Sequence, residues 1–147
     1  MKNIRIVAYE NKMKPQVRTL FRTIYPDLPD MADRMTYDDQ IPNHITTQVA
    51  LEGDSIIGQA NIILKPELSG MANLGFHFHP EKRKLGVAKA LSRKAITIAA
   101  SKGINEIYIR THKGNTAAIA VADSLAFTRI DSSNEDDEMI LFKKTVL

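Results

Sequence analysis

The chain has 147 residues, of which 44% are hydrophobic and 25% are charged, a composition typical of one folded domain rather than of a disordered or fibrous chain. The absence of cysteine excludes a disulfide framework, thiolate metal sites and a cysteine nucleophile. The longest stretch free of Asp, Glu, Lys and Arg, Leu68 to Pro80, is well short of the ~20 apolar residues of a membrane span, and the charged N-terminus does not resemble a signal peptide. We therefore expect a single domain, residues 1–147, in the cytoplasm and without a membrane partner.

The formal net charge of +3 hides an uneven distribution along the chain. The segment from Lys82 to Lys102 contains seven Lys or Arg residues and no Asp or Glu, which leaves 13 basic and 17 acidic residues elsewhere. A nucleic-acid binder usually spreads basic residues over a broad face. Because the positive excess is confined to one segment, we expect a discrete anion site there and no binding to nucleic acid.

The N-terminal half is expected to form a strand, a helix and an antiparallel meander. Alternating polarity predicts a strand from Ile4 to Ala8. A helix follows, because Pro15 suits a first helical turn and apolar residues recur on one helical face at Val17, Leu20, Phe21 and Ile24. A short second helix is expected from Met31 to Asp39. The turn "EGDS" predicts a hairpin, and the three strands of the meander are Thr47 to Leu51, Ser55 to Leu64 and Asn73 to Phe78.

The apolar period then changes to that of a helix, with Val87, Leu91, Ala95 and Ile98 on one face. This helix should end near Lys102, with Gly103 in the left-handed conformation after it. A strand in "EIYIRT" follows this helix. Because a helix connects it to the third meander strand, we expect these two strands to pair in parallel. The remaining expected elements are a helix at 115–125, a strand at 127–130, the acidic loop "DSSNEDDE" and a strand at 139–145. The fold class is α/β (α+β), a mixed central sheet with an antiparallel meander, a parallel crossover and helices on both faces.

The segment "KRKLGVAKAL" lies between a predicted strand and the start of a helix. About four backbone N–H groups at such a start lack partners within the helix, and the helix dipole adds partial positive charge, which favours phosphate binding. Gly86 and Ala88 keep the backbone approachable, while Arg83 and Lys84 add charged donors. From these residues alone, a diphosphate site and a solvated basic helix start both stay open.

Two motifs resemble the GNAT superfamily of acyl-coenzyme A dependent N-acyltransferases. Its R/Q-x-x-G-x-G/A signature is matched in "PEKRKLGVA" by Pro80, Arg83, Gly86 and Ala88. Its second motif is similar to "NTAAIAVADSLAF", where the matching residues are Asn115, Ala118, Leu125 and Phe127. The expected order of elements is also similar from about residue 46 onward, so the resemblance implies a GNAT-like domain.

The resemblance implies an N-acetyltransferase that moves an acetyl group from acetyl-CoA, its cosubstrate, to a primary amine of a small molecule or peptide by direct attack in a ternary complex. The diphosphate would lie on the basic loop. The pantetheine arm would add like a strand along the third meander strand, where a backbone N–H stabilises the oxyanion. The implied cofactor-binding residues are Phe76, His77, Phe78, Arg83, Lys84, Leu85, Gly86, Val87, Ala88, Lys89 and Asn115.

The sequence departs from the family pattern at the catalytic positions. Ala122 stands where the family often has a tyrosine that protonates the departing thiolate, Ala126 replaces a glycine, and Met71 to Leu74 offer no general base. The replacement candidates are His77 and His112 as bases acting through water, and Ser124 as a donor to the thiolate. For each of them, a purely structural role is the alternative.

Other polar residues leave the acceptor open and argue against a metal. His77 and His79 have a spacing that some metal sites use on a strand, but without cysteine or a third ligand we expect no metal. Acidic residues gather in two segments, one with Asp27, Asp30, Asp33, Asp38 and Asp39, the other from Asp131 to Glu138. They either attract a cationic amine or belong to ordinary solvated loops.

A second function class also stays open. Because Ala122 and the missing base weaken the case for catalysis, the chain is alternatively an acyl-CoA binding sensor or regulatory module. Release of free thiol in a screen of amines distinguishes the enzyme from the sensor. The sequence is compatible with a monomer or a homodimer.

Overall fold

The computed structural model of the protein describes residues 3–28, 30, 43–65, 71–82, 85–130 and 138–146. These residues form a seven-stranded mixed sheet in the order β1-β2-β3-β4-β5-β7-β6. The strands are β1 (Ile4–Ala8), β2 (His44–Glu52), β3 (Ser55–Lys65), β4 (Met71–Phe78), β5 (Glu106–His112), β6 (Thr128–Ile130) and β7 (Met139–Thr145). The short 3-10 helix η1 (Asn11–Met13) precedes α1 (Lys14–Ile24), and the later helices are α3 (Leu85–Ser101) and α4 (Thr116–Ser124).

This architecture confirms the predicted mixed sheet with an antiparallel meander and a parallel crossover. The strands from β1 to β4 pair antiparallel in succession, and β4 pairs in parallel with β5, which follows α3 in the chain. Among the predicted strands, the largest difference is at β2, which begins at His44 rather than Thr47. The helix predicted from Met31 to Asp39 and most of the predicted acidic loop, residues 131–137, lie outside the described residues.

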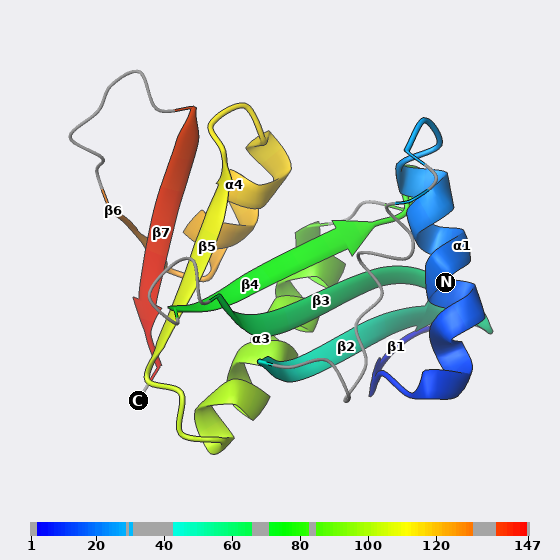
Figure 1. The fold of residues 1–147 in the computed structure, drawn as a ribbon, viewed down its shortest axis with the longest axis horizontal. Coiled ribbons are helices and arrows are strands. Elements are labelled where there is room, and N and C mark those ends of the chain that lie inside the picture. The colour runs from blue at the N-terminus through cyan, green and yellow to red at the C-terminus, as the bar shows by residue number, and fades with distance from the viewer. Residues whose placement is uncertain are drawn as a thin grey trace.

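Helices cover both faces of the sheet, as predicted (Figure 1). On one face, α3 packs against β2 and β3 around a core that includes Leu91 and Ile107. On the other face, α1 buries the predicted apolar residues Val17, Leu20 and Phe21. Each large apolar side chain that is buried contributes about 1.5–3 kcal/mol. The two cores therefore fix the sheet between α1 and α3.

The β2–β3 hairpin turns through two residues, as the segment "EGDS" predicts. Glu52 pairs with Ser55, so the turn consists of Gly53 and Asp54. Gly53 has a φ of 62°, in the left-handed region that glycine adopts without the clash of a Cβ atom. The glycine therefore allows this tight connection between β2 and β3.

β4 and β5 separate soon after they begin to pair. Their parallel register contains only Ala72 with Ile107 and Asn73 with Tyr108, whereas β4 pairs with β3 from Met71 to Phe78. Figure 1 shows the two strands close together where they begin and diverging beyond, with α4 near the wide end. The edge of β4 that faces β5 is therefore open beyond Asn73.

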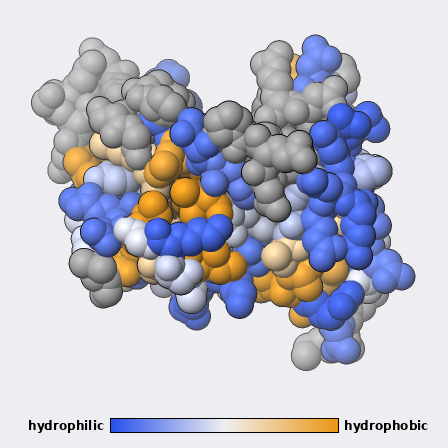
Figure 2. Space-filling view, turned by 60° about the horizontal axis from the view of Figure 1, so that its bottom comes forward, coloured by the Kyte–Doolittle hydropathy of each residue, from blue (hydrophilic) through white to orange (hydrophobic). Residues whose placement is uncertain are grey.

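Hydrophilic residues cover much of the face drawn in Figure 2, with hydrophobic residues between them. Within the described ranges, the exposed large hydrophobic side chains are Leu28 and Ile130. None of the helices in these ranges is long and apolar enough to cross a membrane. Most large apolar side chains of the described chain are thus at least partly buried in the two cores.

α3 and α4 end in the same backbone motif but with different residues at its left-handed position. Gly103 follows α3 with a φ of 90°, and Ala126 follows α4 with a φ of 61°. In both cases the next residue donates its N–H to a helix carbonyl, Ile104 to Ala99 at 3.1 Å and Phe127 to Ala122 at 2.9 Å, which is a Schellman motif. Left-handed backbone costs a residue with a Cβ about 1–2 kcal/mol, so Ala126 is strained where Gly103 is not.

We expect Ala126→Gly to stabilise the protein by about 0.5–1 kcal/mol, because relief of the left-handed strain exceeds the extra chain entropy that glycine gives the unfolded state. The Tm should rise by about 1–4 °C in thermal unfolding. Gly103→Ala is the matched control, since a Cβ there meets nothing within 4 Å and only its φ opposes the change, so it should destabilise by a similar amount. A lower Tm for Ala126→Gly would contradict the strain.

Candidate functional site

The open edge of β4 presents the backbone groups of alternate residues. The His79 N–H donates to the Ile57 carbonyl at 2.8 Å, and β3 and β4 keep an unbroken register. In an antiparallel ladder, alternate residues direct their N–H and C=O groups toward the same neighbour, so those of Phe76 and Phe78 point away from β3. No described strand pairs with them there, because β5 has diverged. Phe76 and Phe78 therefore offer backbone donors and acceptors to an extended ligand.

Two hollows meet at the end of β4. The first, the sheet hollow, has a volume of about 260 Å³ and is lined by Asn61, Ile63, Lys65, Asn73, Leu74, Gly75, Phe76, His77, Ile109, Arg110, Thr111, Asn115 and Ala118. The second, the helix hollow, has a volume of about 130 Å³ and is lined by Ile24, Tyr25, Phe76, His77, Phe78, Ala88, Asn115, Ala117 and Val121. Phe76, His77 and Asn115 line both hollows, so the fold brings these predicted site residues together.

Asn115 fixes the start of α4 beside both hollows. Its Oδ1 accepts a hydrogen bond from the Ala118 N–H at 3.1 Å and caps the helix, while its Nδ2 donates to Thr111 Oγ1 at 3.1 Å. An asparagine cap of this kind is worth about 1 kcal/mol. The side chain thus fastens α4 to the end of β5, and the Thr111 hydroxyl retains its own proton for another acceptor.

His77 lines both hollows and contacts two aromatic side chains, Phe21 of α1 and Tyr25 directly after this helix. Its ring centroid is 5.0 Å from that of Phe21 in an edge-to-face arrangement, and its Nδ1 lies 3.2 Å from the Tyr25 hydroxyl. Burial lowers the pKa of His77 to about 4, because removing a charged imidazolium from water is costly. His77 is therefore a neutral imidazole at pH 7.

The predicted diphosphate loop is described from Leu85 onward. Gly86 is exposed, and a Cβ placed there would meet nothing within 4 Å, so the fold itself does not require glycine at this position. Ala88 is buried and lines the helix hollow, whereas Val87 and Lys89 are half-buried. Arg83, Lys84 and the side chain of Leu85 lie outside what the structure describes.

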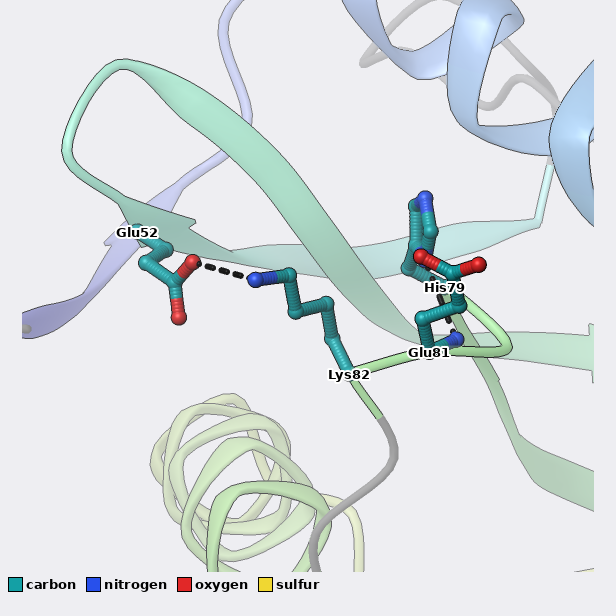
Figure 3. Close-up of polar contacts among 4 residues, drawn as sticks. All are labelled: Glu52, His79, Glu81 and Lys82. Carbon is teal, nitrogen blue, oxygen red and sulfur yellow. Dashed lines mark hydrogen bonds and ion pairs between the residues drawn. The ribbon is translucent and has the colours of Figure 1, made fainter.

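The residues before this loop are tied to the β2–β3 hairpin (Figure 3). Lys82 Nζ lies 3.0 Å from Glu52 Oε1, and the two side chains are 35% and 11% exposed. The Lys82 N–H donates to the His79 carbonyl at 2.9 Å, and the Glu81 N–H donates to His79 Nδ1 at 3.2 Å. A partly buried ion pair is less screened by salt than an exposed one. These contacts therefore anchor the segment that leads from β4 into the loop.

The other predicted catalytic residues lie apart from the two hollows. His112 is exposed, its Nδ1 accepts from the Gly114 N–H at 2.9 Å, and its Nε2 lies 3.3 Å from Glu138 Oε2. Ser124 Oγ donates to the Val121 carbonyl at 2.9 Å. This local hydrogen bond is the structural role that the sequence left open as the alternative to a catalytic one. Neither His112 nor Ser124 lines either hollow, so their catalytic roles stay predictions without support from this geometry. Ala122 is fully buried in the core.

The acidic residues that were considered as a binding site for a cationic amine do not line either hollow, as far as the structure describes them. Asp27 and Asp30 are exposed, and Glu138 contacts His112. Asp33, Asp38, Asp39 and residues 131–137 lie outside the described ranges. The described charged side chains that do line the sheet hollow are Lys65 and Arg110.

Sequence reasoning missed Tyr25, Thr111 and the pair of cations in the sheet hollow. Tyr25 follows α1 and reaches His77, which lies 52 positions later in the chain. A tyrosine after a helix carries no signal for such a contact. Thr111 is a polar residue at a buried position of a predicted strand, and that mismatch is the signal that would have indicated it.

Comparison with known proteins agrees with this geometry. The family model described as "Acetyltransferase (GNAT) family" matches residues 14–127. No curated protein sequence matches the chain. The match covers α1, the meander, the loop, α3, β5 and α4, which are the elements that surround the two hollows.

Solved structures resemble the whole chain at low sequence identity. The GNAT domain of PAT from S. lividans is 16% identical with a TM-score of 0.79, over 97% of this chain and 90% of that one. An N-acetyltransferase from Staphylococcus aureus Mu50 is 14% identical with a TM-score of 0.77, over 99% of both chains. A putative acetyltransferase from Salmonella typhimurium, solved with its cofactor acetyl-CoA, is 12% identical with a TM-score of 0.73, over 98% and 94%. These similarities establish the fold.

The low pKa of His77 makes the stability of the protein depend on pH. The pKa is about 4 in the folded state against an ordinary value of 6.5, so the unfolded state binds more protons between these two pH values and the free energy of unfolding decreases as the pH falls. Each pKa unit corresponds to about 1.4 kcal/mol. Relative to His77→Gln, the wild type should lose about 2 kcal/mol of unfolding free energy between pH 7 and pH 4.5, measured by urea denaturation. An equal loss in both proteins would show that His77 is not desolvated.

Proposed function

Because the chain belongs to the acetyltransferase (GNAT) family, we propose that it transfers an acetyl group from acetyl-CoA to a primary amine of a small molecule or peptide, in a ternary complex. The observation that carries this proposal is the open edge of β4, flanked by the start of α3 and by two hollows that share Phe76, His77 and Asn115. One hollow is available for the thioester end of the donor and the other for the amine. The cytoplasmic location and the monomeric or dimeric state stay predictions.

Four features of the described chain fit coenzyme A. The backbone at Gly86 is open to a diphosphate, since the space that a Cβ would occupy is free. The small residue Ala88 continues this surface into the helix hollow. The backbone groups of Phe76 and Phe78 face the gap between β4 and β5, where a pantetheine amide would pair like an added strand. Asn115 stands beside the same gap.

The protein itself contributes hydrogen-bond donors and the positioning of the two substrates. Bound acetyl-CoA supplies the activated acyl group. Of the Phe76 and Phe78 N–H groups at the open edge, the one that does not pair with the pantetheine amide is available to a developing oxyanion, and one preorganised donor to an oxyanion is worth about 2.7–4 kcal/mol. The binding residues hold the amine next to the thioester, and such positioning replaces a collision in solution.

Proton movement is assigned to two side chains that contact each other. The neutral imidazole of His77 lines both hollows and accepts the proton of the amine through water. Tyr25 lines the helix hollow, and we assign its hydroxyl, in place of that of Ser124, as the donor to the departing thiolate. The Tyr25 hydroxyl lies 3.2 Å from His77 Nδ1, so the imidazole provides a route by which the phenol regains a proton.

The sensor hypothesis remains the second candidate, and a specific observation favours it. A pKa of about 4 makes His77 a weak base, and Ala122 offers no proton donor. A sensor would bind acetyl-CoA without releasing free thiol in the presence of amines. An enzyme would release thiol in proportion to acetylated amine.

Binding of coenzyme A should depend on the absence of a side chain at Gly86. Coenzyme A at ~100 times its Kd should stabilise the wild type by about 2.7 kcal/mol in thermal unfolding. Gly86→Val should fold with similar stability, because its Cβ meets no neighbour, and should lose this ligand-dependent shift. Gly86→Ala should lie between the two.

Lys94→Val serves as the control, because Lys94 is exposed on the same helix beyond its first turn. It removes a positive charge and adds the same side chain as the test variant. An undiminished shift in Gly86→Val would place the diphosphate elsewhere. An equal loss in Lys94→Val would mean that charge rather than backbone approach controls binding.

The two histidines should differ in their effect on acetylation. We expect His77→Gln to lower kcat/KM by about 100-fold, the scale of a lost general base, and His112→Gln to leave it within about twofold because His112 lines neither hollow. Initial rates of thiol release give both values. Equal rates for the wild type and His77→Gln would exclude His77 as the base.

Tyr25→Phe tests the proton donor in the same assay while keeping the aromatic packing on Phe21. We expect a loss in kcat of about tenfold or more, and a smaller loss with an acyl donor whose thiol is more acidic. Ser124→Ala should change neither value. A loss in Ser124→Ala but not in Tyr25→Phe would return the donor role to Ser124.

A further inference from the structure

The sheet hollow carries positive charge and no described negative charge. Lys65 and Arg110 are the charged residues among those that line it. Lys65 ends β3 opposite Met71 of β4, and Arg110 lies on β5 opposite Leu141 of β7. The two cations therefore approach the hollow from strands on either side of β4.

Neither Lys65 nor Arg110 forms an ion pair with a carboxylate in the described part of the chain. The ion pairs found there join Lys12 with Glu10, Lys82 with Glu52, His112 with Glu138 and Lys143 with Glu106. Lys65 and Arg110 are therefore positioned to bind an external anion, and the fork of the Arg110 guanidinium suits a carboxylate or phosphate.

The floor of the hollow adds polar groups between the cations and His77. Asn61 and Asn73 line it, and the Oδ1 atom of Asn73 is buried without a hydrogen-bond partner. An unsatisfied buried carbonyl oxygen favours a ligand with an N–H donor. A Cβ at Gly75 would lie 3.1 Å from Asn61 Oδ1, so the glycine leaves space for this carboxamide.

We propose that the acceptor is an amine that also carries an anionic group, a carboxylate or a phosphate, which Lys65 and Arg110 bind. This proposal rests on the proposed function, since it assigns the sheet hollow to the acceptor. The amine end lies toward Asn73 and His77, and the anionic end toward the two cations. A volume of about 260 Å³ holds a molecule of amino-acid size, given that a water occupies about 30 Å³ in the liquid. The positive lining opposes a purely cationic amine.

The test compares amines that differ only in the anionic group. Amino acids are compared with the matching amino-acid amides, and O-phosphoethanolamine with ethanolamine, by initial rates of thiol release. We expect kcat/KM to be about tenfold to 100-fold higher for the charged member of one pair, the scale of one or two charge-assisted hydrogen bonds. The pair that shows the larger ratio identifies carboxylate or phosphate as the group.

Variants connect the preference to the two cations. Arg110→Gln and Lys65→Gln should each reduce the ratio within the preferred pair, and the double variant should abolish it. Arg93→Gln is the matched control, since Arg93 is exposed on α3 and lines neither hollow, and it should keep the full ratio.

The outcomes separate this proposal from the proposed function. Acetylation with equal rates for charged and uncharged members, or a ratio that survives the double variant, would overturn the anion site while the enzyme activity stands. If no amine is acetylated, calorimetric titration of amino acids and of O-phosphoethanolamine into the protein loaded with coenzyme A decides. Binding that is lost in the double variant supports the anion site in a sensor, and absence of binding overturns it.

Discussion

The separation of β4 from β5 after two paired positions is the constraint on which the candidate site depends. If the parallel ladder continued beyond Asn73, β5 would occupy the backbone groups of Phe76 and the space of both hollows. Because it does not, a central strand of the sheet has an edge open to a ligand. Asn115 holds this arrangement by capping α4 and bonding Thr111 at the end of β5. The hollows are therefore a consequence of strand pairing rather than of loops added to the sheet.

The packing of α1 determines the chemical state of His77 in the site. Phe21 is fully buried and its ring meets that of His77, so the same contact that stabilises α1 removes water from the imidazole. A buried imidazole without a described carboxylate partner stays neutral. Tyr25 brings the only phenol among the side chains that line the described hollows to within hydrogen-bonding distance of His77. Core stability and proton chemistry are thus linked through one residue pair.

The sheet hollow is positively charged, although the sequence outside Lys82 to Lys102 is net acidic. Outside Lys82 to Lys102 the sequence has more acidic than basic residues, which suggested an attraction for cations. The sheet hollow nevertheless places Lys65 and Arg110 together, although they lie 45 positions apart in the sequence. At short range, inside a hollow with a lower dielectric, two nearby charges outweigh the screened sum of distant ones. The field that an acceptor meets is therefore decided by folding.

Short-range sequence patterns were sufficient to predict the described strands and helices and the start of α3. Alternating apolar and polar residues predicted β1, and the turn "EGDS" predicted the hairpin. Apolar residues at helical spacing, followed by Gly103, predicted α3. Phe76, His77 and Asn115 were also predicted, because the family resemblance implies that the cofactor arm lies along the third meander strand and touches Asn115 of the second motif. The fold was needed to reveal that Tyr25 contacts His77, that Ala126 has a left-handed backbone, and that His112 and Ser124 lie outside both hollows. These properties arise from contacts between distant segments and from backbone angles that no local spacing encodes.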